Sequence, residues 1–426
     1  MTTAVSRIQI EQDIVELLSR MDAETQLLPI PMSATALAAD TTSIRCTTLD
    51  RGSPSTGRYD GMIVKIVDDT GAGPAVGETS MVASAGYDGT DKLTVSPAFT
   101  AAVISGQQFM LYPPRWAPEH IVSAIRRTLR STYIPTIWAP SMIADPDLSA
   151  SDTITDNWDD VGAVTTTDFE TGAANVLLGA RSLKVVGGAA TGLASDSFPV
   201  HDVRSVLVVV PVAVSAGSMT VVLYRATTTA ADLRSVTMDE IAFTDCRFTE
   251  TFTAGTKQAQ IRFLAAEAAS TFYVSPHIIV QANGVHAYNL PSWLVNPDHI
   301  LGAAFMPSSQ GANDQDNYVP LSDFMQNEPD FRILRSDRDV TPLRLQFRGG
   351  TYPLYLRVLR QAADLSSDSA TTIVNRGWLA KKTAANLLRD RGVDEWKRVA
   401  REAMQAAAEA GYAAGPISVQ ERLTVG

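Results

Sequence analysis

The chain has 426 residues, of which 45% are hydrophobic and 19% charged, and its formal net charge is −11 at pH 7. This length predicts two or three domains, and this composition excludes a disordered chain. The negative charge excludes sequence-independent nucleic-acid binding by the chain as a whole, although a local basic face could still act. Cys46 and Cys246 are far apart in the sequence, so we expect no disulfide framework and folding in a reducing compartment.

The sequence predicts a soluble protein that is made inside a cell. Residues 1–18 lack a continuous apolar segment, so we expect no signal peptide. The longest apolar run, Val206–Val214, has the length of a strand and contains Pro211. We therefore expect no segment that spans a membrane.

The chain alternates between helical and β-type patterns. Ile10, Ile14 and Leu18 recur at helical spacing and predict an amphipathic helix over Ser6–Leu28. Five short β-type runs follow, separated by turns that contain Gly and Asp, and they predict a small barrel or sandwich. After a second helix and an acidic spacer, a longer stretch is rich in Val and Thr and has frequent turns. This stretch predicts a β-sandwich that is jelly-roll-like.

The longest helical signal is Trp378–Gly411. Ala and straight-chain residues favour helix there, and Gly392 followed by Asp394 fits a C-terminal cap and an N-cap. We therefore expect two helices joined by a tight turn. The segments predicted in chain order are an N-terminal helix in 1–36, a small β domain in 37–112, a helix and linker in 113–150, a jelly-roll-like β-sandwich in 151–289, a mixed region that closes with the helical hairpin in 290–411, and an extended tail in 412–426.

No motif for catalysis, phosphate binding or a metal agrees with its context in the sequence. The glycine-rich run DDTGAGPAVGE, at 68–78, lies between strands with no helix after it, so its glycines are expected to serve turns. None of the five histidines is paired with Cys, His or a carboxylate at metal-ligand spacing. We therefore expect no enzyme activity, no cofactor and no metal site.

An acidic group around Trp158 is the best small-molecule candidate. Asp152, Asp156, Asp159 and Asp160 could hold a Ca²⁺ at the edge of a sandwich. An exposed Trp158 could also stack on a sugar ring. The alternative, which we favour, is a solvated linker in which Trp158 anchors the first strand of the sandwich.

Basic residues in two helical segments suggest a contact with DNA. They could touch phosphates, line a channel or form an interface between subunits. The alternative, which we favour, is an ordinary amphipathic helix with a charged face toward solvent. The residues concerned are Arg126, Arg127, Arg130, Lys381, Lys382, Arg389, Lys397, Arg398 and Arg401.

The C-terminal tail has the spacing of an extended segment. Its apolar residues are Ile417, Val419, Leu423 and Val425. Such a segment could add a strand to the sheet edge of a neighbouring protein, and a frayed terminus is an equal alternative.

Several stretches resemble head-to-tail connector (adaptor or neck) proteins of tailed bacteriophages. They are an N-terminal helix of the type EQDIVELLSRMD, a β segment GETSMVASAGYDGTDKLTVSPAFTAAVISGQQFMLYPP followed by the helix WAPEHIVSAIRRTLRSTYIP, and the terminal YLRVLRQAADLSSDSATTIVNRGWLAKKTAANLLRD. The central block, which begins NWDDVGAVTTTDFETGAANVLLGARSLKVVGG, resembles the jelly rolls of carbohydrate-binding modules, with an early Trp and a GARSLKV strand.

The resemblance to connectors implies a homo-oligomeric ring that joins the portal protein to tail or neck proteins in the virion. The helices that form the ring would be Ser6–Leu28, Pro118–Ser131 and Trp378–Gly411, and Gly415–Gly426 would dock on the portal. Such a ring lines the DNA passage and needs lateral contacts but no catalytic residue. The inserted sandwich would project from the ring and could bind surface glycan.

The sequence leaves two other functions open. The chain could be a tail or fibre protein whose sandwich binds host-surface carbohydrate, and, with less support, a glycan hydrolase. In each case the expected fold class is α+β and multidomain, with a discontinuous helical module, a small β-barrel-like segment and an inserted jelly-roll-like β-sandwich.

Overall fold

A computed structural model of the chain describes residues 5–21, 32–47, 49, 57, 59–68, 73–144, 146–148, 157–170, 175–177, 181–226, 230–253, 255–294, 296–334, 343–362, 364–365, 371–372, 374–390 and 396–409. The chain divides into two compact units. Unit 1 combines Met1–Ile134 with Gln361–Gly426, and unit 2 is Pro135–Arg360. Because unit 2 is inserted into the sequence of unit 1, the N-terminal and C-terminal parts of the chain fold together.

Short strands of unit 1 form one antiparallel six-stranded sheet in the order β2-β7-β4-β5-β6-β3. A bridge between Leu37, just after β2, and Arg45, in β3, joins the two ends of this order, so the sheet closes into a small barrel. Val64, Leu93 and Phe109 fill its interior. The sequence predicts β3 to β7, and the structure adds β2. The strands are β2 (Met32–Thr35), β3 (Ser43–Arg45), β4 (Ile63–Ile66), β5 (Thr79–Tyr87), β6 (Lys92–Ser96) and β7 (Gln108–Tyr112).

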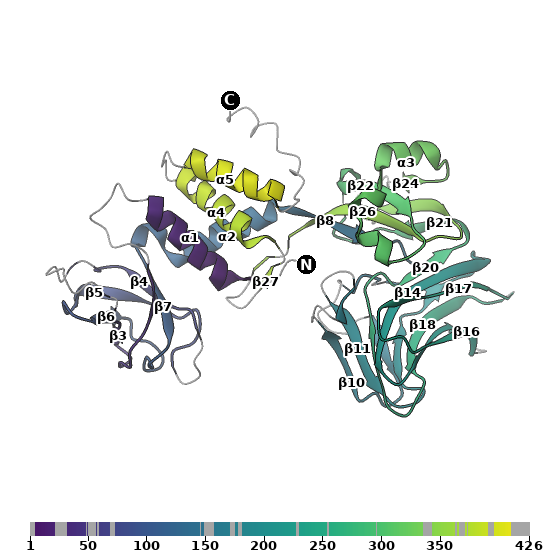
Figure 1. Cartoon of the computed structure of the whole chain (residues 1–426), viewed down its shortest axis with the longest axis horizontal. Coiled ribbons are helices and arrows are strands. Elements are labelled where there is room, and N and C mark those ends of the chain that lie inside the picture. The colour runs from purple at the N-terminus through teal and green to yellow at the C-terminus, as the bar shows by residue number, and fades with distance from the viewer. Residues whose placement is uncertain are drawn as a thin grey trace. The chain divides into compact units, whose positions relative to one another are not determined.

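The helices of unit 1 share one apolar core, which includes Ile14, Ile125, Leu379 and Val399. Tyr112 of β7 belongs to the same core, so the helices cover part of the outside of the barrel. Figure 1 shows α1, α2, α4 and α5 lying together. The elements are β1 (Val5–Ser6), α1 (Arg7–Met21), the 3-10 helix η2 (Pro114–Trp116), α2 (Pro118–Arg130), β27 (Thr371–Thr372), α4 (Arg376–Asp390) and α5 (Trp396–Glu409), and β1 pairs with β27.

The observed helices lie within or close to the helical segments expected from the sequence. Residues 22–31, the second part of the expected N-terminal helix, lie outside the described residues, as do Gly392 and Asp394 of the expected tight turn. Pro118 occupies the first turn of α2, where its missing N–H costs no hydrogen bond. No helix in the described part of the chain is both long and apolar enough to cross a bilayer.

A buried carboxylate fixes α1 to the barrel. Glu11 of α1 accepts a hydrogen bond at 2.7 Å from Nζ of Lys65 in β4 and another at 3.2 Å from the hydroxyl of Tyr112 in β7. The side chains of Glu11 and Lys65 are only 1% and 4% exposed, and Arg7 lies 3.3 Å from the second carboxylate oxygen. A buried charge is tolerated only when it is paired and hydrogen-bonded, so these contacts specify where α1 lies on the barrel.

Unit 2 contains a β-sandwich of two antiparallel six-stranded sheets. The β18 sheet has the order β16-β15-β18-β12-β9, with β13 also paired to β18, and the β14 sheet has the order β10-β11-β19-β14-β17, with β20 also paired to β14. The chain passes repeatedly from one sheet to the other, and the side chains between the sheets form a single core. The predicted jelly-roll-like sandwich is therefore confirmed.

The strands of the sandwich have the following bounds. The β18 sheet contains β9 (Trp158–Val161), β12 (Gly192–Ser195), β13 (Phe198–Pro199), β15 (Met219–Arg225), β16 (Ala231–Met238) and β18 (Gln258–Ala265). The β14 sheet contains β10 (Thr166–Glu170), β11 (Ser182–Gly187), β14 (Ser205–Ala216), β17 (Thr244–Thr251), β19 (Ser270–Val274) and β20 (Ile279–Ala282).

The central strand β14 explains the longest apolar run of the sequence. On one side it pairs with β17, and on the other it pairs first with β20, through Val206–Val209, and then with β19, from Val212 onward. Pro211 lies between these two pairings, and its carbonyl accepts a hydrogen bond from the N–H of Ser275. A proline lacks the N–H that an interior strand donates, so it is accommodated where the partner strand changes.

The rest of unit 2 is a small β domain with its own apolar core. Its sheets have the orders β21-β25-β24 and β23-β22-β26-β8, and Figure 1 shows it beside β20 and β14. The elements are β8 (Tyr133–Trp138), β21 (Gly284–Asn289), β22 (Ile300–Phe305), β23 (Val319–Pro320), α3 (Leu321–Asn327), β24 (Arg332–Leu334), β25 (Arg344–Gly349), β26 (Leu354–Gln361) and the 3-10 helices η5 (Pro297–His299), η6 (Gln310–Asn313) and η7 (Gln315–Asn317).

Replacing Glu11 with Leu should lower the free energy of unfolding by about 3–5 kcal/mol, because the buried ammonium of Lys65 loses its carboxylate. The double change Glu11→Leu with Lys65→Met should recover most of this loss, and denaturant unfolding measures both. As a control, Glu402→Gln, which removes the exposed pair with Arg398, should change stability by less than about 0.5 kcal/mol. If the double variant is no more stable than Glu11→Leu, the loss of stability does not come from the unpaired charge of Lys65.

Candidate functional site

Trp158 does not form an exposed stacking surface. Its side chain is 1% exposed, and its ring stacks on Phe263 inside the sandwich with centroids 5.4 Å apart. The sugar-stacking hypothesis for Trp158 is therefore wrong, and the alternative, that it anchors the first strand, is the one that the structure supports. Asp152 and Asp156 lie outside the described residues, and no cluster of three metal-ligating side chains occurs among the residues that the structure describes.

The basic residues expected to face DNA are partly neutralised by carboxylates of the same unit. Arg126 and Arg130 of α2 lie 3.6 and 3.7 Å from Asp364, and Arg127 pairs with Asp390. Such pairs lower the local positive charge that phosphates would recognise. In addition, Arg398 pairs with Glu402 at 3.0 Å, and Arg389 lies 3.9 Å from Asp390. The lysines and the arginine that remain differ in exposure. Those on α5, Lys397 and Arg401, are exposed, and those on α4, Lys381 and Lys382, are half-buried.

The predicted docking residues Ile417, Val419, Leu423 and Val425 lie outside the described residues. The docking of this tail therefore stays a prediction.

The two outer faces of the sandwich differ in how they are covered. On the β14 sheet, Leu207, Val209 and Ile279 point outward into an apolar cluster with Met306 and Tyr355 of the small β domain. By contrast, no strand of the β18 sheet contributes to an apolar cluster outside the sandwich, within the described part of the chain. Figure 1 shows β16 and β18 on the side of the sandwich away from β21, β22 and β26. The small β domain thus covers the outer face of the β14 sheet and not that of the β18 sheet.

The middle of this face carries Tyr224 of β15 and Gln260 and Arg262 of β18. The guanidinium carbon of Arg262 lies 3.2 Å from the centroid of the Tyr224 ring, and Nη2 of Arg262 donates to Oε1 of Gln260 at 3.2 Å. All three side chains are partly exposed, whereas Ile261 and Phe263, between and beyond them in β18, are buried in the core. Alternate residues of a strand point to the same face, so these three form one polar cluster, the Tyr224 cluster.

Hydroxyl and carboxylate side chains surround the Tyr224 cluster. The hydroxyls of Thr220 and Thr237 lie 3.3 Å apart across β15 and β16, and Ser235 is exposed nearby on β16. Asp232 is exposed on β16 and Asp159 on β9, which are the two edge strands of the sheet. Four strand spacings separate these edges, roughly 19 Å, so the two carboxylates lie too far apart to act on one bond.

Sequence reasoning did not single out the Tyr224 cluster. The signal available was the alternation in QAQIR, residues 258–262, in which polar residues occupy every second position. That pattern identifies Gln260 and Arg262 as facing outward. It cannot tell which outer face of the sandwich another domain covers, because the covering residues come from a different part of the chain.

His277 is a buried histidine of the sandwich whose pKa is strongly shifted. It is buried in a loop between β19 and β20, has φ of +69°, and its N–H donates to the carbonyl of Pro146 at 2.7 Å. Burial lowers the pKa of His277 to about 4, and the nearby Asp147 opposes this shift. Because its ring is enclosed against Tyr355, we assign His277 to the packing of unit 2 rather than to catalysis.

His277 should make unit 2 sensitive to acid. Its pKa is lower in the folded chain than the ordinary value of about 6.5, so the unfolded chain binds a proton first and stability falls as the pH drops from 6.5 toward 4. Asparagine tolerates this backbone conformation, so His277→Asn is a suitable variant. We expect the fall in its free energy of unfolding between pH 7 and pH 4 to be smaller by up to roughly 3 kcal/mol, measured by urea unfolding at both pH values. Exposed His201→Asn serves as the control and should keep the acid dependence of the unaltered protein. An unchanged dependence in His277→Asn would contradict the assignment.

No protein-family model and no curated protein matches the chain. Solved structures similar to a part of it include a CBM4 carbohydrate-binding module (12% identity, 37% of this chain and 99% of the module, TM-score 0.25) and a family 22 carbohydrate binding module of Clostridium thermocellum (13%, 32% and 92%, 0.26). Another is the enzymatically active domain of a bacteriophage CBA120 tailspike protein (11%, 30% and 19%, 0.25). The chain thus spans about a fifth of the tailspike chain. At these identities and TM-scores the similarity concerns fold alone and carries no argument about what this chain binds.

Proposed function

We propose that this chain is a virion protein of the tail or fibre type whose sandwich binds surface carbohydrate through the outer face of the β18 sheet. The observation that carries the proposal is the Tyr224 cluster, which lies on the one outer face of the sandwich that the small β domain does not cover. The surrounding hydroxyls of Thr220, Thr237 and Ser235 extend the polar surface.

The Tyr224 cluster suits the chemistry of a sugar. A sugar ring presents hydroxyls at its edge and C–H groups on its faces, so it needs fixed planar donors and acceptors beside a flat surface. Tyr224 and Gln260 hold the Arg262 guanidinium in one orientation. The one hydrogen bond that the Arg262 guanidinium makes among the described residues is that from Nη2 to Gln260, so this partly exposed group keeps other N–H donors that a ligand hydroxyl could use.

We propose binding without hydrolysis. A glycosidase needs two carboxyl groups about 5–10 Å apart across the bond that it cleaves. Among the described residues of this face, Asp159 and Asp232 lie on opposite edge strands. Affinity for one short glycan would be low, because the hydroxyls exchange water for protein partners, and several copies of the chain in a virion would raise the avidity.

The arginine-to-methionine change Arg262→Met tests the surface directly. It keeps the length of the side chain and removes its donors, so we expect retention on host-surface polysaccharide to fall about tenfold, measured by affinity electrophoresis. Tyr224→Ala should lower retention by a similar factor. Both side chains lie at the surface, so we expect the unfolding midpoint of each variant to stay close to that of the unaltered protein. Exposed Arg204→Ala, in the β14 sheet region, is the matched control and should bind as the unaltered protein does. Equal losses in Arg204→Ala and Arg262→Met, or no retention of any polysaccharide by the unaltered protein, would exclude this surface.

A head-to-tail connector is the second candidate, and the shared helical core of unit 1 favours it. α1 and α2 from the N-terminal part pack with α4 and α5 from the C-terminal part, which leaves unit 2 as an insertion that could project from a ring. Exposed Lys397, Arg401 and Met404 on α5 offer a surface for a neighbouring subunit or the portal.

The connector proposal requires a closed ring. Negative-stain microscopy of the purified chain should show rings with one number of subunits, because repeated heterologous contacts around an axis close only at a fixed count. Met404→Glu should disrupt them by placing a charge on the exposed face of α5, while Met81→Glu, at another exposed methionine, should not. Monomers or trimers at high protein concentration would favour the tail or fibre protein instead.

A further inference from the structure

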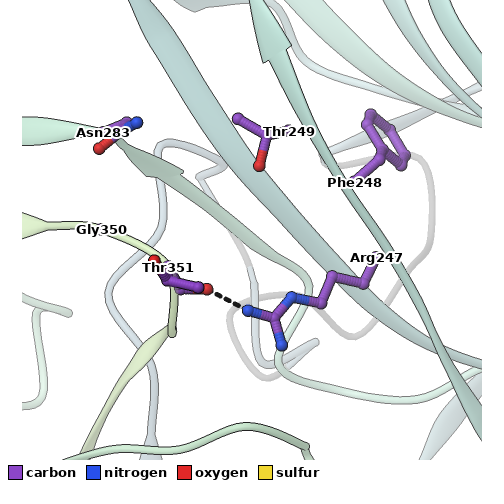
Figure 2. A pocket seen from close by; sticks show the side chains of 6 residues that line it. All are labelled: Arg247, Phe248, Thr249, Asn283, Gly350 and Thr351. Atoms are coloured by element: carbon purple, nitrogen blue, oxygen red, sulfur yellow. Dashed lines mark hydrogen bonds between the residues drawn. The ribbon is translucent and has the colours of Figure 1, made fainter.

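A second polar surface lies at the edge of the β14 sheet, where the small β domain stops covering it. A hollow of about 430 Å³ opens there, between β17 and the turn that joins β25 to β26 (Figure 2). Its lining residues are Arg247, Phe248, Thr249, Asn283, Gly350 and Thr351. Phe248 points into the sandwich core, so the side chains available to a ligand are the polar ones.

The guanidinium of Arg247 is held in place before any ligand arrives. Nη1 donates to the carbonyl of Pro307 at 3.0 Å, Nη2 donates to the carbonyl of Thr351, and the group lies 5.2 Å from the centroid of the Tyr352 ring. A guanidinium has five N–H donors, so these two bonds leave three for a ligand. A donor fixed in this way loses little entropy when it binds.

The positive charge of Arg247 remains available to a ligand. Its two hydrogen-bond acceptors are neutral carbonyls, and no carboxylate lies within ion-pair distance of it among the described residues. The nearest acid on the same face of β17 is Asp245, whose carboxylate accepts a hydrogen bond at 2.7 Å from the N–H of Ser309. A fixed cation of this kind favours an anionic group, and a carboxylate matches its planar fork.

The rest of the hollow suits hydroxyl groups. Thr249 offers a hydroxyl and Asn283 a side-chain amide, and neither makes a side-chain hydrogen bond within the described part of the chain. Both are exposed, as is the ring of Tyr352, 46% of whose surface is accessible, beside the guanidinium. Ligand sites commonly have volumes of about 300–1,000 Å³, so the hollow has room for one sugar ring.

We propose that this hollow binds an acidic sugar, a uronic acid residue, with its carboxylate on Arg247 and its hydroxyls on Thr249 and Asn283. The site is separate from the Tyr224 cluster, which lies on the opposite sheet of the sandwich. It selects acidic over neutral sugars because a neutral sugar leaves the guanidinium without a counter-charge.

The test compares two trisaccharides of equal length, tri-galacturonate and galactotriose, by isothermal titration with the full chain. We expect tri-galacturonate to bind at least tenfold more tightly, and we expect this preference to weaken as salt is added. Arg247→Gln should abolish the preference. Because Arg247 also holds two backbone carbonyls, the variant Thr249→Val with Asn283→Ala leaves those bonds intact and should still weaken tri-galacturonate binding about tenfold.

The control variant is Lys397→Ala, whose exposed side chain lies on α5 in unit 1 and which should leave tri-galacturonate binding unchanged. The variant Thr249→Val with Asn283→Ala changes the hollow alone and Arg262→Met changes the Tyr224 cluster alone, so a failure of this site can be told apart from a failure of the function proposed for the β18 sheet. Three results would overturn it: equal affinity for both trisaccharides, binding of inorganic phosphate as tight as that of tri-galacturonate, or full binding by the Thr249→Val, Asn283→Ala variant.

Discussion

Unit 2 depends on one strand that is buried on both of its faces. The inward side chains of β14, such as Val206 and Val208, pack between the two sheets of the sandwich, while Leu207 and Val209 pack against the small β domain. A strand buried on both faces must be apolar throughout, and this produces the continuous run Val206–Val214. The same constraint decides which surface of the sandwich stays open, since covering the β14 sheet leaves the β18 sheet uncovered.

Polar contacts at the junction fix how the small β domain lies on the β14 sheet. The side chain of Gln281 in β20 donates to the carbonyls of Pro140 and Leu354 and accepts from the N–H of Leu354. The hydroxyls of Ser309 and Tyr355 lie 2.9 Å apart, and both residues are fully buried. Apolar contact alone permits sliding, whereas satisfied buried hydrogen bonds permit one register. The hollow at Arg247 exists because this register leaves the edge strand β17 partly uncovered.

In unit 1 the same principle operates through charge. Glu11 and Lys65 join α1 to the barrel, and Arg376 of α4 donates two hydrogen bonds to Asp13 of α1. The arginines of α2 find their carboxylates in Asp364 and Asp390, more than two hundred positions later in the chain. Carboxylates of the same unit therefore partly neutralise the arginines that the sequence suggests for DNA contact, while Arg127 and Arg130 of α2 stay exposed, as do Lys397 and Arg401 of α5.

What the sequence determines by itself is the type and order of the elements. Periods of about 3.6 and 2 residues depend only on which side chains must leave water, so they identify α1, α2, α4, α5 and most strands of the barrel and sandwich. The sequence also predicts that Trp158 anchors the first strand of the sandwich, because a large apolar ring is ordinarily buried. Only the tertiary structure decides which outward side chains meet, as in Tyr224 with Arg262 or Arg247 with the turn after β25. The physical reason is that these contacts depend on strand order, register and domain coverage, which bring together residues whose spacing along the chain carries no signal.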